Sequence, residues 1–125
     1  MCVKVMAPMR ITEALLPLVE KGARKALIYL SSRMGSITEN PSNQYVYRSS
    51  KAALNSAVKG LAGDLKAKGI IAVVFHPGWV RADMGGDKAP LSPPESVAGL
   101  RKVILGLSPT DSGRFINYDG TTIPW

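Results

Sequence analysis

A tyrosine and a lysine four positions apart could carry acid–base chemistry in this chain of 125 residues. Tyr47 and Lys51 stand near the start of a segment with helical periodicity, and residues four apart share one face of a helix. A lysine ammonium beside a phenol favours the phenolate and lowers the tyrosine pKa from about 10. Such a tyrosine can exchange a proton with a carbonyl or alcohol oxygen near neutral pH. Taken alone, however, this spacing more often describes two surface residues, so the neighbouring elements decide its meaning.

Three segments have the apolar spacing of an amphipathic helix, at residues 7–20, 45–68 and 92–107. Gly22 and Gly69 are plausible terminators of the first two. Ser92 followed by Glu95 predicts a capping box at the start of the third. The longest segment, 45–68, is rich in small side chains, which would let another helix or a cofactor approach it closely.

Three apolar runs, each following one of these helices, predict strands at residues 26–30, 70–75 and 113–118. The first two runs are continuously apolar, which is typical of strands buried on both faces of a parallel sheet. Alternation of helices and strands predicts a parallel sheet with right-handed crossovers and helices on its faces. We therefore expect an α/β fold, built as a single domain over residues 1–125.

Polar and turn-forming residues follow the first two predicted strands. Residues 31–36 come after the first strand and residues 76–80 after the second. In open α/β sheets, ligands bind at the carboxyl ends of parallel strands. A serine hydroxyl at such an end can hydrogen-bond a substrate oxygen. We therefore expect these two loops and the start of the helix with Tyr47 and Lys51 to meet at one edge of the sheet.

Taken in order, these motifs resemble the short-chain dehydrogenase/reductase family, and within it the sniffer-like and C-factor-like carbonyl reductases. The motifs that carry the resemblance are Ser31-Ser32-Arg33-Met34-Gly35-Ser36, Tyr47-x-x-x-Lys51-Ala52-Ala53, His76-Pro77-Gly78-Trp79-Val80-Arg81, Asp83-Met84-Gly85-Gly86 and Asp111-Ser112-Gly113-Arg114-Phe115. The likeness covers essentially the whole chain. It implies a Rossmann-like three-layer sandwich with about three parallel strands and three helices, without the N-terminal nucleotide-binding βαβ half of that fold.

The resemblance also implies residue roles. Tyr47 would be the catalytic acid/base, and Lys51 would lower its pKa and bind the nicotinamide ribose. Ser32 would hold the substrate carbonyl. Three further residues would line the nicotinamide site, namely Pro77, Gly78 and Val80. The implied reaction is the reduction of a ketone or an aldehyde, a small-molecule carbonyl substrate, with NADP or NAD as the cofactor.

Three departures from the family pattern bear on this interpretation. The family's Gly-rich turn, which holds the pyrophosphate at a helix N-terminus, is absent. Lys4 stands where the family often has an asparagine, and Ala82 where it commonly has a threonine. These departures favour a second hypothesis, a non-catalytic interaction or signalling fragment of the family. A third hypothesis is a hydrolase in which Ser32 is the nucleophile, activated by Tyr47 and Lys51.

Composition narrows the remaining classes. The net charge is +7, but the basic residues are scattered, so we do not expect a nucleic-acid partner. No apolar run approaches the roughly 20 residues of a membrane span. No spacing of cysteine, histidine and carboxylate residues indicates a metal site. The single cysteine and the absence of a signal-peptide pattern predict a cytoplasmic protein. His76, the only histidine, is interpreted as structural. Because the strand at residues 26–30 would be an apolar sheet edge, we expect a homo-oligomer.

Overall fold

The computed structural model describes the backbone of residues 2–82 and 85–125, and the side chains of these ranges from Val3 onward. None of the helices in these ranges is long and apolar enough to cross a membrane. In chain order the elements are α1 (Cys2–Lys21), β1 (Ala26–Leu30), the 3₁₀ helix η1 (Arg33–Gly35), α2 (Tyr45–Leu65), the 3₁₀ helix η2 (Lys66–Lys68), β2 (Ile71–His76), α3 (Pro93–Leu105), the 3₁₀ helix η3 (Pro109–Asp111) and β3 (Phe115–Asn117).

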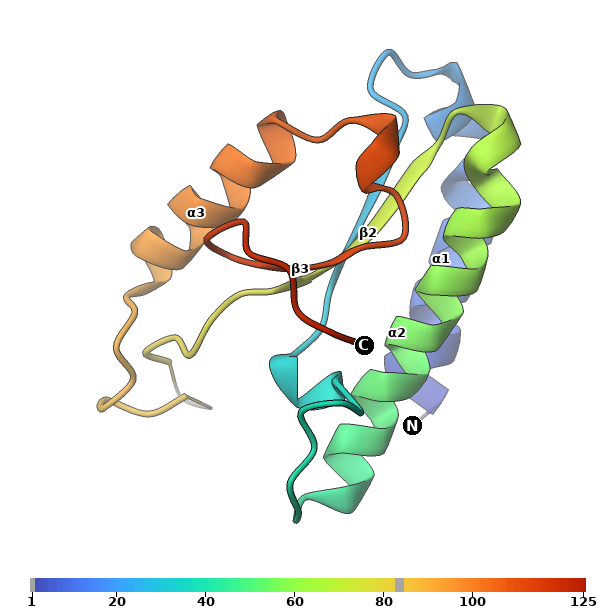
Figure 1. Cartoon of the computed structure of the whole chain (residues 1–125). Coiled ribbons are helices and arrows are strands. Elements are labelled where there is room, and N and C mark those ends of the chain that lie inside the picture. Colours follow the sequence, from blue (N-terminus) through green and yellow to red (C-terminus); the bar gives the residue numbers. More distant parts are fainter. Residues whose placement is uncertain (1, 83–84) are drawn as a thin grey trace.

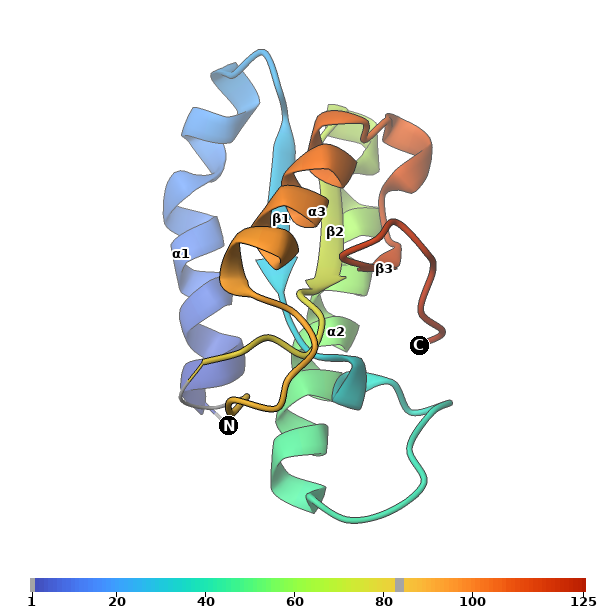
Figure 2. The ribbon, with the colours of Figure 1, turned by 90° about the vertical axis from the view of Figure 1, so that its left-hand side faces the viewer.

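The three strands form one parallel sheet in the order β1-β2-β3. β1 and β2 pair in register from Ala26 opposite Ile71 to Leu30 opposite Phe75. Helices α1 and α2 cover one face of the sheet, and α3 covers the other (Figures 1 and 2). The expectation of an α/β three-layer arrangement with three parallel strands and three α-helices is confirmed.

Successive residues of β2 point to opposite faces of the sheet and enter two separate apolar clusters. Val74 packs with Leu54 and Val58 of α2. Val73 and Phe75 belong to the second cluster, against which the inner face of α3 packs. All three β2 residues are completely buried. Burial on both faces explains why the sequence of this strand is continuously apolar rather than alternating.

Several element boundaries differ from those expected. α1 begins at Cys2 rather than near residue 7, and it continues through Pro17 to Lys21. It is tied to the sheet by a buried hydrogen bond of 2.6 Å between the Thr12 and Tyr29 hydroxyls. β3 covers three residues only, because Gly113 has a φ of +84° and the Arg114 N–H bonds the Asp111 carbonyl in a turn. The capping box of Ser92 and Glu95 at the start of α3 is present as expected.

The last residues of the chain hold the loop that follows η1. The Ser36 hydroxyl donates to the Pro124 carbonyl at 2.6 Å, and the Ile37 N–H donates to the Trp125 carbonyl. The Trp125 ring stacks on Phe115 with 5.5 Å between the ring centroids. These contacts link the core beneath β3 to the loop that leaves the end of β1.

The 3₁₀ helix η1 rests directly on α2, and a glycine makes that approach possible. A Cβ atom built on Gly35 would lie 2.7 Å from Asn55 Nδ2 and 3.0 Å from both the carbonyl carbon and the Cβ of Lys51. The contact with Asn55 is closer than real Cβ atoms show, and the two contacts with Lys51 are tighter than nine in ten of them. The absence of a side chain at Gly35 therefore sets the distance between the end of β1 and the first turns of α2.

Gly35→Ala tests this contact. We expect the added methyl group to push η1 away from α2 and to lower the free energy of unfolding by about 1–3 kcal/mol, the usual cost of overpacking. Urea denaturation followed by circular dichroism measures it. The matched control is Gly63→Ala on α2, where an added Cβ meets nothing within 4 Å; it should be neutral or stabilise by up to about 1 kcal/mol. Equal stability of the two variants would contradict the close packing.

Candidate functional site

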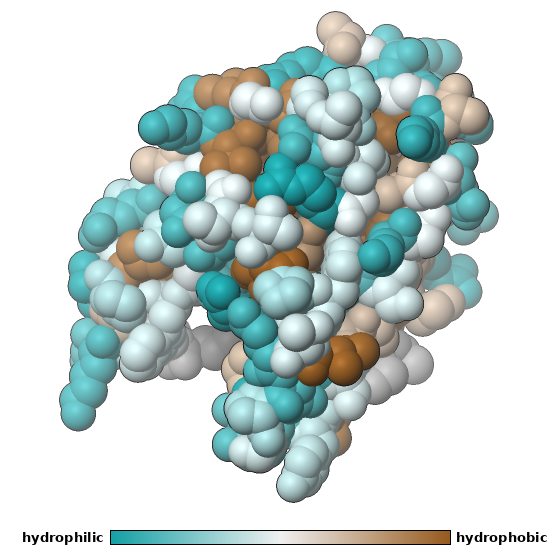
Figure 3. All heavy atoms as spheres, in the orientation of Figure 1, coloured by the Kyte–Doolittle hydropathy of each residue, from teal (hydrophilic) through white to brown (hydrophobic). Residues whose placement is uncertain are grey.

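A cavity of about 640 Å³ opens at the carboxyl ends of β1 and β2. The space-filling view shows the surface hollowed between the loop that follows β2 and the start of α2 (Figure 3). Five of the six site residues expected from the sequence line this cavity: Ser32, Tyr47, Pro77, Gly78 and Val80. The sixth, Lys51, lies one turn further along α2 and does not line it.

The two serines that end β1 make different contacts. Ser32 is 9% exposed and caps η1, because its Oγ accepts a hydrogen bond from the Met34 N–H at 3.2 Å. This leaves the Ser32 hydroxyl proton and a second lone pair for another group. Ser31 also contributes to the lining of the cavity. Its Oγ, however, is buried and has no hydrogen-bond partner in the described parts of the chain, so Ser32 is the better candidate for contact with a ligand.

Tyr47 and Lys51 lie on the same face of α2, as their spacing predicts. The Lys51 Nζ is 5.9 Å from the centroid of the Tyr47 ring. Partial burial lowers the pKa of Lys51, and the positive charge of Lys4 on α1 lowers it further. The residue that replaces the expected asparagine therefore acts electrostatically on the expected catalytic lysine.

The loop after β2 needs its glycine both for backbone conformation and for space. Gly78 has a φ of +87°, and a Cβ there would overlap the side chains of Leu91 and Tyr118. The Pro77 carbonyl accepts a hydrogen bond from Ser96 of α3, so the loop is fixed to the helix on the far face of the sheet. Ala82 also lines the cavity, and it offers no hydroxyl there. Asp83 and Met84 of the next motif lie outside the described residues.

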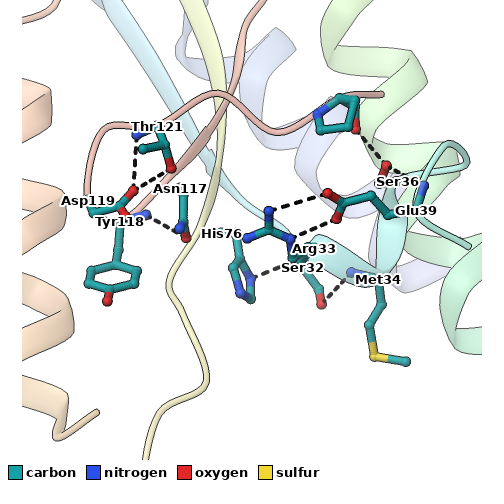
Figure 4. Close-up of polar contacts among 11 residues, drawn as sticks. Ser32, Arg33, Met34, Ser36, Glu39, His76, Asn117, Tyr118, Asp119 and Thr121 are labelled. Carbon is teal, nitrogen blue, oxygen red and sulfur yellow. Dashed lines mark hydrogen bonds and ion pairs between the residues drawn. The ribbon is translucent and has the colours of Figure 1, made fainter. Parts of the chain in front are cut away.

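A contact between the two strand ends was missed by the sequence analysis. The Arg33 N–H donates a hydrogen bond of 3.0 Å to Nδ1 of His76, and the Arg33 side chain forms an ion pair of 2.7 Å with Glu39 (Figure 4). His76 lines the cavity beside the expected site residues. The sequence did mark His76, as the single histidine before Pro77-Gly78. It could not show that Arg33 is its hydrogen-bond partner, because that depends on the register of the two strands.

The environment of His76 keeps its ring neutral. The pKa of His76 is lowered from 6.5 to about 4, chiefly by burial and to a smaller extent by the positive charge of Arg33, while Glu39 acts in the opposite direction. In the unfolded chain the same ring takes up a proton near pH 6.5. His76 therefore contributes stability that is present above pH 6.5 and is lost as the pH falls toward 4.

His76→Asn tests this dependence, because the asparagine Oδ1 can still accept the Arg33 N–H. We expect the free energy of unfolding of the unmodified chain to fall more between pH 6.5 and 4 than that of the variant. Urea denaturation at half-unit pH steps measures both curves. Arg33, Glu39 and the other titrating groups are common to both proteins. Measurements at pH 7–8, where His76 is largely neutral in both the folded and the unfolded chain, give the change in the free energy of unfolding that does not depend on pH. Parallel curves across the window would contradict the lowered pKa.

Comparison with known proteins places the chain in a family. Residues 1–91 match the family model described as short chain dehydrogenase. The chain is 47% identical over 124 residues to the C-signal of Myxococcus xanthus, with 98% of this chain and 75% of that protein covered. It is 37% identical to an uncharacterised oxidoreductase of Schizosaccharomyces pombe, of which 55% is covered.

Solved structures give the same answer. The carbonyl reductase Sniffer of D. melanogaster superposes with a TM-score of 0.95 at 40% identity, over 99% of this chain and 55% of that one. An NADPH-bound carbonyl reductase from chicken fatty liver superposes with a TM-score of 0.87 at 38% identity, over 96% and 53%. The chain thus spans about half the length of these reductases. From its sequence, its fold and these matches, the chain belongs to the short-chain dehydrogenase family.

Proposed function

We propose that this protein reduces a ketone or an aldehyde, with NADPH or NADH as the hydride donor. The observation that carries the proposal is the cavity at the ends of β1 and β2, whose wall includes Ser32 and Tyr47 from two different elements. The family of the chain is that of nicotinamide-dependent reductases, and two of the similar structures are named as carbonyl reductases.

The proposed roles follow from the position of each side chain and from the hydrogen-bonding groups that remain available on it. The Ser32 hydroxyl keeps its proton while its Oγ caps η1, so it can donate a hydrogen bond to the substrate carbonyl oxygen. Tyr47 would donate the proton that this oxygen needs to become a hydroxyl. Lys51, with its Nζ 5.9 Å from the centroid of the Tyr47 ring, would keep a positive charge beside the reacting group. A bound nicotinamide cofactor would supply the hydride.

The residues present fit one end of that cofactor. Pro77, Gly78 and Val80 line the cavity and would face the nicotinamide. The other end has less support, because the sequence contains no Gly-x-Gly-x-x-Gly turn to bind the pyrophosphate. We therefore expect this chain by itself to bind the cofactor weakly.

Titration with NADPH and NADH, followed by reduced-nicotinamide fluorescence, tests the proposal. We expect saturable binding, and in Tyr47→Phe unchanged binding with reduction slowed about 100-fold or more, since the proton donor is gone. Carbonyl substrates are screened by loss of absorbance at 340 nm. No binding at millimolar cofactor would overturn the proposal for this chain.

Lys4→Asn tests the electrostatic effect on Lys51. Removing the Lys4 charge should raise the pKa of Lys51, because that charge lowers it in the folded protein. Lys51 would then stay protonated to higher pH, and the high-pH fall of kcat/KM should move upward. Lys21→Asn is the matched control, since Lys21 lies roughly 25 Å further along α1. The same shift in both variants would show a general charge effect instead.

A second candidate is the non-catalytic interaction module. It is favoured by apolar side chains that α1 leaves exposed, including Ile11 (59%) and Leu18 (66%), and by the proximity of Lys4 to Lys51. Ile11, Leu15 and Leu18 follow helical spacing and form one stripe, and we infer that copies of the chain associate through α1 and α2. Under this candidate Tyr47→Phe would bind its partner as the unmodified chain does.

A further inference from the structure

We infer that His76 contacts the substrate: its Nε2–H donates a hydrogen bond to a second acceptor on the molecule, beside the reacting carbonyl. The site would therefore select carbonyl compounds that carry such an acceptor. This inference rests on the proposed function and adds a specificity-determining residue to it.

The tautomer of His76 is set by the backbone. Nδ1 receives the Arg33 N–H at 3.0 Å, and a backbone N–H can only donate. Nδ1 must therefore be unprotonated, and in the neutral ring the proton is on Nε2. No hydrogen bond found among the described residues uses Nε2.

The position of His76 puts this donor on the cavity wall. The register of β1 and β2 ends with Leu30 opposite Phe75. The next residues, Ser31 just after β1 and His76 at the end of β2, therefore lie side by side. Figure 4 shows the His76 ring and the Ser32 side chain at the ends of these neighbouring strands. Both residues line the cavity with Tyr47. A substrate whose carbonyl oxygen reaches Ser32 and Tyr47 would thus have His76 on an adjoining wall.

The contact is one of recognition and not of proton transfer. Because burial lowers the pKa of His76 to about 4, the ring is neutral and keeps the same tautomer across the range in which Tyr47 would act. The ion pair between Arg33 and Glu39 anchors the residue whose N–H orients the ring. His76 therefore offers a fixed donor rather than an acid.

The chemistry of this donor defines the substrate class. An oxygen of a ketone, ester or amide next to the reacting carbonyl can accept the Nε2–H. A substrate without that oxygen leaves a partly buried donor unpaired, which disfavours its binding. Sites built to hydrogen-bond a substrate group discriminate strongly against analogues that lack it.

The first test uses nuclear magnetic resonance, because His76 is the only histidine of the chain. Long-range ¹H–¹⁵N correlation spectra of the full chain at pH 7 should show the Nε2–H tautomer. The probes are 1-phenyl-1,2-propanedione and propiophenone, which differ by one carbonyl oxygen. We expect the dione to shift the Nε2 resonance and propiophenone to leave it in place. The Nδ1–H tautomer, or equal responses to both probes, would overturn the inference.

The second test measures selectivity with variants that separate the two ring nitrogens. His76→Asn keeps an acceptor for the Arg33 N–H and loses the Nε2 donor, whereas His76→Gln places an amide N–H near the Nε2 position. We expect the ratio of kcat/KM for the dione to that for propiophenone to fall about tenfold in His76→Asn and to recover in part in His76→Gln.

The outcomes separate this inference from the proposed function. If the unmodified chain reduces neither probe, the proposed function fails for these substrates and the Nε2 shift alone decides the role of His76. If reduction occurs with the same ratio in the unmodified chain and in folded His76→Asn, the role of His76 is wrong and the proposed function stands. A variant that does not fold by circular dichroism leaves the decision to the resonance shift of the unmodified chain.

Discussion

The packing of Gly35 against the backbone of α2 is the constraint on which the site depends. Ser32 comes from the end of β1, while Tyr47 comes from a helix that begins after a long polar loop. They can share a cavity because η1 lies so close to α2 that a Cβ at position 35 would be 3.0 Å from both the carbonyl carbon and the Cβ of Lys51 and 2.7 Å from Asn55 Nδ2. This contact lies between the two catalytic candidates and fixes both, so a change of a few tenths of an ångström there would move Ser32 relative to Tyr47.

The same loop is held from two further directions. On one side, the Arg33 N–H reaches His76 at the end of β2. On the other, the Ser36 hydroxyl and the Ile37 N–H reach the carbonyls of Pro124 and Trp125. Trp125 is in turn fixed by stacking on Phe115 and by Lys59, whose Nζ lies 5.0 Å from its ring centroid. A site residue on a loop can be precise when the loop is tied to rigid elements in this way.

What the sequence could predict was local or periodic. The continuous apolarity of β2 indicated a strand buried on both faces, and Ser92 with Glu95 indicated the start of α3, because these signals depend on neighbouring residues. The same pattern correctly predicted β1 as a strand, but only Tyr29 of it is buried and Leu30 is exposed, because β1 lies at the edge of the sheet. The hydrogen bond between Arg33 and His76 could not be predicted, because the two residues are 43 positions apart in the sequence. They meet only through the register of β1 and β2. The hydrogen bond between the Ser36 hydroxyl and the Pro124 carbonyl could not be predicted for the same reason, because 88 residues separate the two in the sequence. The stacking of Trp125 on Phe115 likewise joins residues from separate elements, and it is one of the contacts that close the core.

Within these 125 residues, the proposed site has candidate residues for the reacting carbonyl and the nicotinamide but few for the pyrophosphate of the cofactor. Ser32 and Tyr47 line one cavity and Lys51 shares a face of α2 with Tyr47, whereas the sequence has no Gly-x-Gly-x-x-Gly turn to offer backbone donors to a pyrophosphate. Binding energy from remote parts of a ligand normally holds its reactive end in position, so the loss of remote contacts lowers the rate of the chemical step as well as the affinity. At the edge where further strands stand in a complete Rossmann-like sheet, Leu30 of β1 is 56% exposed and the strand has one unpaired side. Under the proposed function, whatever covers that edge would change the rate without contributing a catalytic residue, because it would act on the orientation of the cofactor through the loop that β1 carries.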